Sequence, residues 1–214
     1  MAVRLLVASR NQKKLAELRR VLDAEGIVGI EPIGLDEVPE YPEAPENGAT
    51  FAENATIKSK AGWLATGLPC LADDSGLAVA ALNGMPGVLS ARWAGRHGDD
   101  AANNALLLAQ LADVPDERRG AAFFSSCALT YSARSSAPST ATLVSRVAEG
   151  RWPGRILREL RGEGGFGYDP IFLPEGSDRS AAELTAEEKD ADSHRGRALR
   201  ALVPALRELA EQAA

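Results

Sequence analysis

The sequence is poor in histidine, cysteine and long apolar runs, and each shortage excludes a class of protein. The two histidines, His97 and His194, and the two distant cysteines, Cys70 and Cys127, match no zinc-binding spacing and no disulfide framework. No apolar run approaches the roughly 18 residues that a membrane-spanning helix needs, and the N-terminal run is too short for a signal peptide. We therefore expect a cytoplasmic protein that does not bind a membrane, with both cysteines buried as free thiols.

The fingerprints of several common enzyme classes are also missing. The chain contains no G-x-x-x-x-G-K-[ST] loop, no H-E-x-x-H motif and no EF-hand loop, which disfavours Walker-type ATPases, zincins and calcium sensors. Neither histidine lies near a G-x-S-x-G motif, so a serine hydrolase is disfavoured as well. The net charge of −6 is not the excess of positive charge that is typical of proteins that bind duplex nucleic acid, so we expect no nucleic-acid partner. A polyphosphate ligand would have to be met by a local site.

What is present predicts a single α/β domain over residues 1–214. The composition, 45% hydrophobic and 25% charged, is that of an ordinary globular protein. The alternation of strand and helix patterns, without internal repeats or a linker, favours a central mixed sheet. We expect strands at 3–8 and 29–35, an acidic loop at 36–48, and an antiparallel strand pair at 120–131 and 140–147. Helices are expected at 12–25 and 49–66, after an N-cap at Asp99, and after a capping box formed by Thr185 and Glu188. A last helix is expected from about residue 195, with a kink at Pro204.

The first candidate site is the turn from Ser9 to Lys14, where the first expected strand gives way to a helix. Free backbone N–H groups at a helix N-terminus attract anions, whereas the helix dipole repels lysines there. Lys13 and Lys14 therefore indicate a bound anion. The alternative interpretation is a pair of solvated surface lysines.

The second candidate site is the carboxylate pair Asp73 and Asp74, at the end of an apolar run. Burying carboxylates is costly unless they meet a cation or hydrogen-bond donors. Such oxygen ligands suit Mg²⁺, and the same groups could orient or deprotonate a water for attack on phosphorus. A turn capped by aspartates is the alternative interpretation.

The third candidate site is the glycine-rich loop at 162–167. It fits G-x-G-x-x-G, yet it follows a charged segment and is not continued by a helix, so a dinucleotide fingerprint is disfavoured. A loop that displays Phe166, Tyr168 and Asp169 could hold a flat base by stacking and an edge hydrogen bond. The alternative is a flexible loop with its aromatic rings packed inward. Further donors gather at the start of the last helix: Lys189, His194 and Arg195.

Six segments resemble, in order, the inosine triphosphate pyrophosphatase family in its bacterial form, also described as XTP/dITP diphosphatases. Any one of them would be weak evidence, but six in order over nearly the whole chain are highly specific. The segments are residues 9–14, 50–55, 72–77, 84–92, 164–170 and 193–196.

This resemblance implies an elongated, two-lobed α/β fold around a long central mixed sheet, with a cleft between the lobes, and a homodimer. It implies Mg²⁺-dependent hydrolysis of ITP, dITP and XTP to the monophosphate and pyrophosphate, which would keep deaminated purines out of DNA and RNA. The nearest alternative is a related pyrophosphatase that acts on dTTP, UTP or modified pyrimidine nucleotides. A different class of alternative is a nucleotide-binding regulatory module without catalysis.

The resemblance also assigns roles to residues. Asp74 matches the proton acceptor that activates water and binds Mg²⁺, Asp73 supports it, and Lys58 matches a lysine near the phosphates. Glu46 or Glu40 supplies the second metal carboxylate, and we favour Glu46 for its place before Gly48 and Thr50. Ser9, Asn11 and Lys14 match the triphosphate-binding turn, with Arg10, Gln12 and Lys13 beside them, and Ser75 matches a further substrate contact. The residues that match the purine-recognising wall are Phe166, Gly167, Tyr168, Asp169, Lys189, His194 and Arg195.

Two consequences of these assignments can be checked. Arg10 stands where many relatives have glycine, which is tolerable if its side chain points away from the phosphates. Donors such as His194 or Arg195 would donate hydrogen bonds to a purine 6-oxo group, whereas the 6-amino group of adenine would leave them unpaired. Unpaired buried polar groups can discriminate by about 10⁴-fold.

Overall fold

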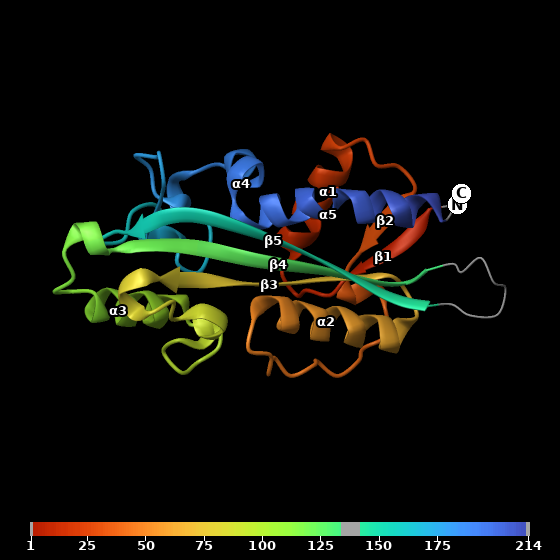
Figure 1. Ribbon diagram of the computed structural model, residues 1–214, viewed down its shortest axis with the longest axis horizontal. Helices are drawn as coiled ribbons and strands as arrows, with labels where there is room; N and C mark the ends of the chain where they lie inside the picture. Colours follow the sequence, from red (N-terminus) through yellow and green to blue (C-terminus); the bar gives the residue numbers. More distant parts are fainter. Residues whose placement is uncertain (1, 134–141, 213–214) are drawn as a thin grey trace. The chain divides into compact units, whose positions relative to one another are not determined.

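The structure, a computed structural model, describes residues 2–133 and 142–212 (Figure 1). The chain divides into two compact units. Unit 1 comprises residues 1–74, 126–150 and 195–214, and unit 2 comprises residues 75–125 and 151–194. Each unit is thus assembled from segments that are far apart in the sequence. Every helix within the described ranges is too short or too polar to cross a bilayer.

The strands form one six-stranded sheet in the order β2-β1-β3-β4-β5-β6. β1 is parallel to β2 and to β3, whereas β5 and β6 are antiparallel, so the sheet is mixed as predicted. The strand bounds are β1 Val3–Val7, β2 Ile30–Ile33, β3 Cys70–Val79, β4 Gly120–Ala133, β5 Thr142–Ile156 and β6 Phe172–Pro174.

Unit 1 has helices on both faces of its strands. Figure 1 shows α1 and α5 on one side and α2 on the other. Leu5 and Val7 of β1 pack with apolar residues of α1 and α5, whereas Leu6 packs with Cys70 and with Trp63 of α2. Because successive strand residues point to opposite faces, β1 is apolar at nearly every position. The helix bounds are α1 Gln12–Ala24, α2 Phe51–Thr66 and α5 His194–Glu211.

The helix caps explain why these helices begin where they do. The Asn11 side chain accepts a hydrogen bond from the Lys13 N–H, and the Thr50 side chain accepts one from the Glu53 N–H. The expected first, second and last helices are therefore confirmed within one or two residues. α5 continues through Pro204, and the kink expected there stays a prediction.

Unit 2 carries the two remaining α-helices and its own core. Phe123, Trp152 and Phe172 form an aromatic group, with Leu107 of α3 in the same cluster. The predicted caps are confirmed, since the Asp99 side chain accepts from the Ala102 N–H and Thr185 and Glu188 form a capping box. The bounds are α3 Asp100–Gln110 and α4 Ala186–Asp192.

One strand prediction was wrong in extent, and the two aspartates of β3 lie in a different setting from the expected one. The structure places Asp73 and Asp74 in the middle of β3 rather than at the end of an apolar run or in a capped turn. β5 was expected to end at 147 but runs to Ile156, while residues 140–141 of that prediction lie outside the described residues. Gly154 lies in the additional part of this strand, where a Cβ would clash with the Leu173 carbonyl of β6, so glycine permits the pairing.

The prediction for the cysteines is confirmed, because Cys70 and Cys127 are both buried and free. The presence of two compact units agrees with the expected two lobes. The assignment of all 214 residues to one functional domain stays a prediction.

Candidate functional site

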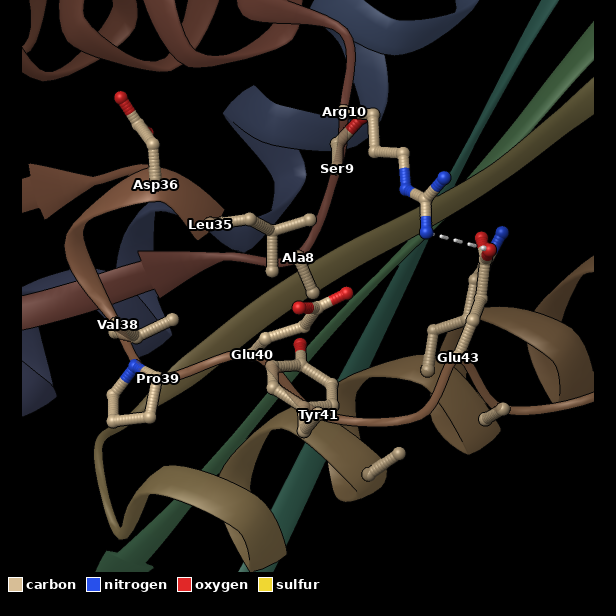
Figure 2. A pocket seen from close by; sticks show the side chains of 13 residues that line it. Ala8, Ser9, Arg10, Leu35, Asp36, Val38, Pro39, Glu40, Tyr41 and Glu43 are labelled. Atoms are coloured by element: carbon tan, nitrogen blue, oxygen red, sulfur yellow. Dashed lines mark ion pairs between the residues drawn. The ribbon is translucent and has the colours of Figure 1, made fainter.

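The turn between β1 and α1 is held by its own side chains. The Ser9 hydroxyl accepts a hydrogen bond from the Asn11 N–H at 3.2 Å, and Asn11 caps the helix through the Lys13 N–H at 3.0 Å. The Arg10 side chain extends toward Glu43, with which it forms an exposed ion pair of 3.4 Å (Figure 2). Its guanidinium thus already has a partner in the acidic loop.

Lys14 lies at the start of a series of ion pairs that runs through Asp73 and Arg195 to Glu17. Its Nζ is 2.8 Å from Asp73 Oδ2. Asp73 also meets the Arg195 Nε at 3.2 Å, and the Arg195 guanidinium meets Glu17 Oε2 at 3.2 Å. The side chains of Asp73, Arg195 and Glu17 are at most 9% exposed. Two positive and two negative groups therefore compensate each other in a mostly dry environment.

Lys58 of α2 joins the second aspartate to the acidic loop. Its Nζ lies 2.9 Å from Asp74 Oδ1 and 3.0 Å from Glu46 Oε1. The fully buried Asn54 donates to Asp74 Oδ2 at 3.2 Å and accepts from the Gly48 N–H at 2.8 Å. This amide connects the loop that carries Glu46 to the Asp74 carboxylate. We call the side chains of Lys14, Glu17, Glu46, Lys58, Asp73, Asp74 and Arg195 the charged cluster.

The two neighbouring aspartates of β3 have pKa values displaced in opposite directions. Burial favours the neutral form of Asp73, but Lys14 and Arg195 outweigh it and hold the pKa of Asp73 well below its ordinary value. For Asp74, burial and the nearby Glu46 raise the pKa, against the opposing effect of Lys58. Environments that separate the pKa values of two carboxylates are typical of sites in which one carboxylate stays ionised and the other exchanges a proton.

The charged cluster also contains the oxygen ligands that a divalent cation requires. Asp74 and Glu46 both form ion pairs with one cation, the Lys58 ammonium. Mg²⁺ typically takes one or two carboxylates together with substrate phosphate oxygens, so this pair is sufficient. No group of three or more metal-ligating side chains occurs among the described residues.

Glu40, the other candidate metal ligand, lines a cavity of about 440 Å³ in unit 1 (Figure 2). Ser9 and Lys58 contribute to the same wall, and Figure 2 shows Glu40 beside Tyr41. The ion pairs of Lys58 thus favour Glu46 over Glu40 as the partner of Asp74.

In unit 2, the end of the glycine-rich loop is organised by Asp169. Its Oδ2 accepts from the Phe166 N–H at 2.8 Å and from the Lys189 Nζ at 2.6 Å. A Cβ on Gly165 would clash with the same carboxylate, and Gly165 has a φ of +76°, so glycine is required there. The Phe166 ring is 42% exposed, and the Lys189 Nζ lies 5.5 Å from its centroid. An exposed aromatic face with a cation beside it can stack on a flat ring.

The other predicted contacts of unit 2 are more deeply placed. Tyr168 is 4% exposed, and its hydroxyl donates to the Ser90 carbonyl at 2.9 Å. The His194 ring is stacked on Phe123, with centroids 4.9 Å apart. The Ser75 hydroxyl donates to Ser125 at 2.9 Å. Substrate contact by Tyr168, His194 and Ser75 stays a prediction.

The structure sorts the sequence-predicted residues between the two units. Unit 1 brings together Lys14, Lys58, Asp73 and Asp74, and unit 2 brings together Phe166, Asp169 and Lys189. Arg195 was predicted beside His194 in the purine wall, but its side chain lies in the charged cluster of unit 1. Gln12 and Lys13 lie on the exposed side of α1.

Sequence reasoning gave no role to Glu17 or Asn54. A signal for Glu17 existed, because this carboxylate stands three residues after Lys14, between the buried Leu15 and Leu18. Asn54 lies in one of the segments that carried the resemblance, yet its bonds to Asp74 and to the backbone of the acidic loop depend on tertiary structure.

Comparisons with known proteins agree over nearly the whole chain. The family model of the Ham1 family matches residues 5–205. A protein of Nocardia farcinica named dITP/XTP pyrophosphatase is 66% identical, over 98% of this chain and 97% of its own. A protein of Mycobacteroides abscessus with the same name is 64% identical, over 97% of this chain and 96% of its own.

Solved structures are similar as well. The crystal structure of a nucleoside-triphosphatase / dITP/XTP pyrophosphatase from Mycobacterium abscessus has a TM-score of 0.74 and 64% identity, covering 96% of this chain and 100% of that one. A HAM1 protein from Coxiella burnetii has a TM-score of 0.81 and 42% identity, covering 96% of this chain and 99% of that one. The mixed α/β fold described above is thus shared with both.

Proposed function

The chain belongs to the Ham1 family, and we propose that it hydrolyses deaminated purine nucleoside triphosphates, namely ITP, dITP and XTP, to the monophosphate and pyrophosphate. The names of the relatives support this activity over hydrolysis of dTTP, UTP or modified pyrimidine nucleotides. Removal of such nucleotides would keep them from being incorporated into DNA and RNA. Action in the cytoplasm as a homodimer, without a nucleic-acid or membrane partner, is part of the same proposal.

Asp74 is the proton acceptor in this proposal. Its pKa is raised by burial, and Lys58 holds one of its oxygens while Asn54 holds the other. A water that attacks the α-phosphorus gives its proton to Asp74 as the new oxygen–phosphorus bond forms. The bond from the α-phosphorus to the bridging oxygen breaks, and pyrophosphate leaves with the electron pair of that bond.

The cations of the charged cluster bind the triphosphate. Lys14 stands in the first turn of α1, next to the turn of Ser9 and Asn11, and Lys58 stands beside Asp74. Their positive charges would offset the charge that develops on the departing pyrophosphate. Asp73 stays ionised and keeps Lys14 and Arg195 in place.

Asp74 and Glu46 would hold a Mg²⁺ ion, for which the two carboxylates and the substrate oxygens form a suitable donor set. When bound, the ion would supply Lewis-acid stabilisation of phosphate charge. Lys58 would then share its two carboxylate partners with the ion.

The base is read by unit 2. Phe166 offers an exposed ring for stacking, and Lys189 offers an ammonium beside that ring. His194, held flat against Phe123, is the further donor for a purine 6-oxo group. An adenine amino group would leave these donors unpaired, which is the basis proposed for its rejection.

The observation that carries the proposal is the shared contact of Asp74 and Glu46 with Lys58, beside an ionised Asp73. The test is pyrophosphate release from dITP, XTP, dATP, dGTP and dTTP, each with Mg²⁺ and with EDTA, with the nucleotide products separated by anion exchange. We expect rapid conversion of dITP and XTP to monophosphates only with Mg²⁺. Release of single phosphates, or a preference for dTTP, would contradict the cleavage position or the base assignment respectively.

A further inference from the structure

Helix α3 forms hydrogen bonds with both backbone groups of Gly167, the residue between Phe166 and Tyr168. The Gly167 N–H donates to Asp100 Oδ2 at 2.7 Å, and its carbonyl accepts from Asn104 Nδ2 at 2.8 Å. Both side chains come from the first two turns of α3. We call this pair of bonds the α3 clamp.

We infer that Asn104, acting with Asp100, is a positioning residue that fixes the base-reading loop and so sets selectivity for the purine. This inference rests on the proposed function, and it adds two residues of α3 to the machinery of that site. Both residues bond to the backbone of the loop. Their effect passes through the backbone of Gly167 to Phe166.

The bonding of Asn104 explains why an asparagine stands there. Asn104 is 3% exposed, and its Nδ2 donates to the Asp100 carbonyl as well as to the Gly167 carbonyl, each at 2.8 Å. Its Oδ1 has no hydrogen-bond partner among the described residues. A buried amide oxygen without a hydrogen-bond partner costs free energy, so the hydrogen bonds that the amide nitrogen donates must offset that cost. The donor bond to the loop is what this side chain contributes.

The backbone conformation of Gly167 makes the clamp necessary. Its φ of +61° lies in the left-handed region, which glycine adopts without the steric cost of a Cβ. A glycine there could adopt many other conformations, and each would turn the Phe166 ring differently. The α3 clamp removes that freedom before a ligand arrives, so binding has less ordering to accomplish.

The residues on both sides of the Phe166 ring are anchored, whereas Phe166 is exposed. Tyr168 is tied to the Ser90 carbonyl, and the Phe166 N–H is tied to Asp169. Phe166 itself is 42% exposed, so its ring can be reached by a ligand. Loss of the clamp should therefore alter the stacking surface without touching the charged cluster of unit 1.

The experiment compares Asn104→Ala with the wild type in three measurements. These are the KM and kcat for dITP, the Kd for IMP by calorimetry, and the Ki of inorganic triphosphate, which carries no base. We expect KM for dITP and Kd for IMP to rise about tenfold, the factor that corresponds to one ordinary hydrogen bond, with Ki for triphosphate unchanged. A purely structural role would move all three together.

The helix supplies a matched control in Asn103→Ala. Asn103 is 2% exposed on the same helix, but it accepts from the Ala94 N–H at 2.7 Å and contacts the Ala91 carbonyl at 3.4 Å instead of the loop. Asp100→Asn keeps an acceptor for the Gly167 N–H and should retain most of the dITP selectivity. Asn104→Asp removes the donor and should behave like Asn104→Ala.

The possible results distinguish failure of the role inferred for Asn104 from failure of the proposed function. Unchanged KM and Kd in Asn104→Ala, an equal rise in the Ki for triphosphate, or the same changes in Asn103→Ala would each overturn the inference. Failure of the wild-type protein to hydrolyse dITP would refute the proposed function instead. The IMP measurement would still test the clamp in that case.

Discussion

The charged cluster of unit 1 and the glycine-rich loop of unit 2 hold their functional groups in different ways. In unit 1, side chains of opposite charge bind one another, as Lys14 does with Asp73 and Lys58 with Asp74. In unit 2, side chains bind the backbone of the loop, as Asn104 does with Gly167 and Asp169 with Phe166, and a single ion pair of Asp169 with Lys189 stands beside them. In the free protein, buried charged groups need partners of opposite charge, because an unpaired buried charge is unfavourable. An aromatic ring that stacks on a base carries no charge and needs only a fixed orientation.

This contrast predicts two kinds of defect. Changes in unit 1 should alter the rate, the binding of triphosphate and the stability of the fold. Changes around the loop should alter the choice of base with little effect on the affinity for triphosphate alone. The variants below test that division, beginning with the largest expected effect.

Asp74→Asn should reduce kcat for dITP by about 10² to 10⁴, because a general base contributes that much and the amide cannot accept the proton. Asn can still accept a hydrogen bond from Lys58, so the fold should survive. The measurement is pyrophosphate release, with circular dichroism to verify folding. Asp23→Asn, an exposed change on α1, is the control. Retention of more than about a tenth of the wild-type rate would contradict the assignment of Asp74.

Asp73→Asn tests the structural half of the charged cluster. Removal of this buried negative charge leaves Lys14 and Arg195 with less compensation, and we expect the free energy of unfolding to fall by about 3–5 kcal/mol at neutral pH. Because the folded-state pKa of Asp73 lies below its ordinary value, the contribution is complete above about pH 4 and is lost as the pH falls further. The difference between wild type and variant should therefore shrink on acidification.

Urea unfolding of the metal-free wild type and variant at about pH 6 and about pH 3 measures this difference. The other carboxylates titrate in both proteins, so their effects cancel in the comparison. A difference that is small at both pH values, or that grows on acidification, would show that Lys14 and Arg195 do not stabilise the Asp73 carboxylate.

Lys14→Ala should raise KM for dITP and the Ki of inorganic triphosphate by about 10- to 100-fold, which is the size expected for a lost charge-assisted hydrogen bond. The ratio of kcat/KM between dITP and dATP should stay constant, because the base is read in unit 2. Lys60→Ala removes an exposed lysine of α2 and is the control for the loss of positive charge. An unchanged KM for dITP would exclude Lys14 from triphosphate binding.

The helices and the candidate residues were largely predictable from the sequence because their signals are local. Asn11 and Thr50 cap helices through side chains that lie two or three positions from their donors. Likewise, the glycines of the loop at 162–167 indicate from the sequence alone a backbone with positive φ angles, which the structure has at Gly162, Gly165 and Gly167. The resemblance then gave the order of the motifs and the activity of the family.

The arrangement of charges was not predictable in the same way. Arg195 follows His194 directly, yet its partners are Asp73 and Glu17, which are 122 and 178 residues away. Asp73 and Asp74 were expected at the end of an apolar run, whereas they lie in the middle of β3, although acidic residues are depleted in strands. Tertiary contacts compensate their burial there: Lys14 and Arg195 pair with Asp73, and Lys58 and Asn54 contact Asp74.

Phe166→Ala gives the smallest expected effect and the sharpest separation of the two units. The exposed ring contributes stacking, which is worth a factor of about ten, so KM for dITP and Kd for IMP should rise by about that amount. Phe166→Trp keeps an aromatic face and should restore most of the affinity. The Ki of inorganic triphosphate should match the wild type in both variants, since the ring lies outside the charged cluster. If Phe166→Ala weakened triphosphate as much as IMP, base and phosphate binding would depend on one shared element, and the division between the two units would have to be abandoned.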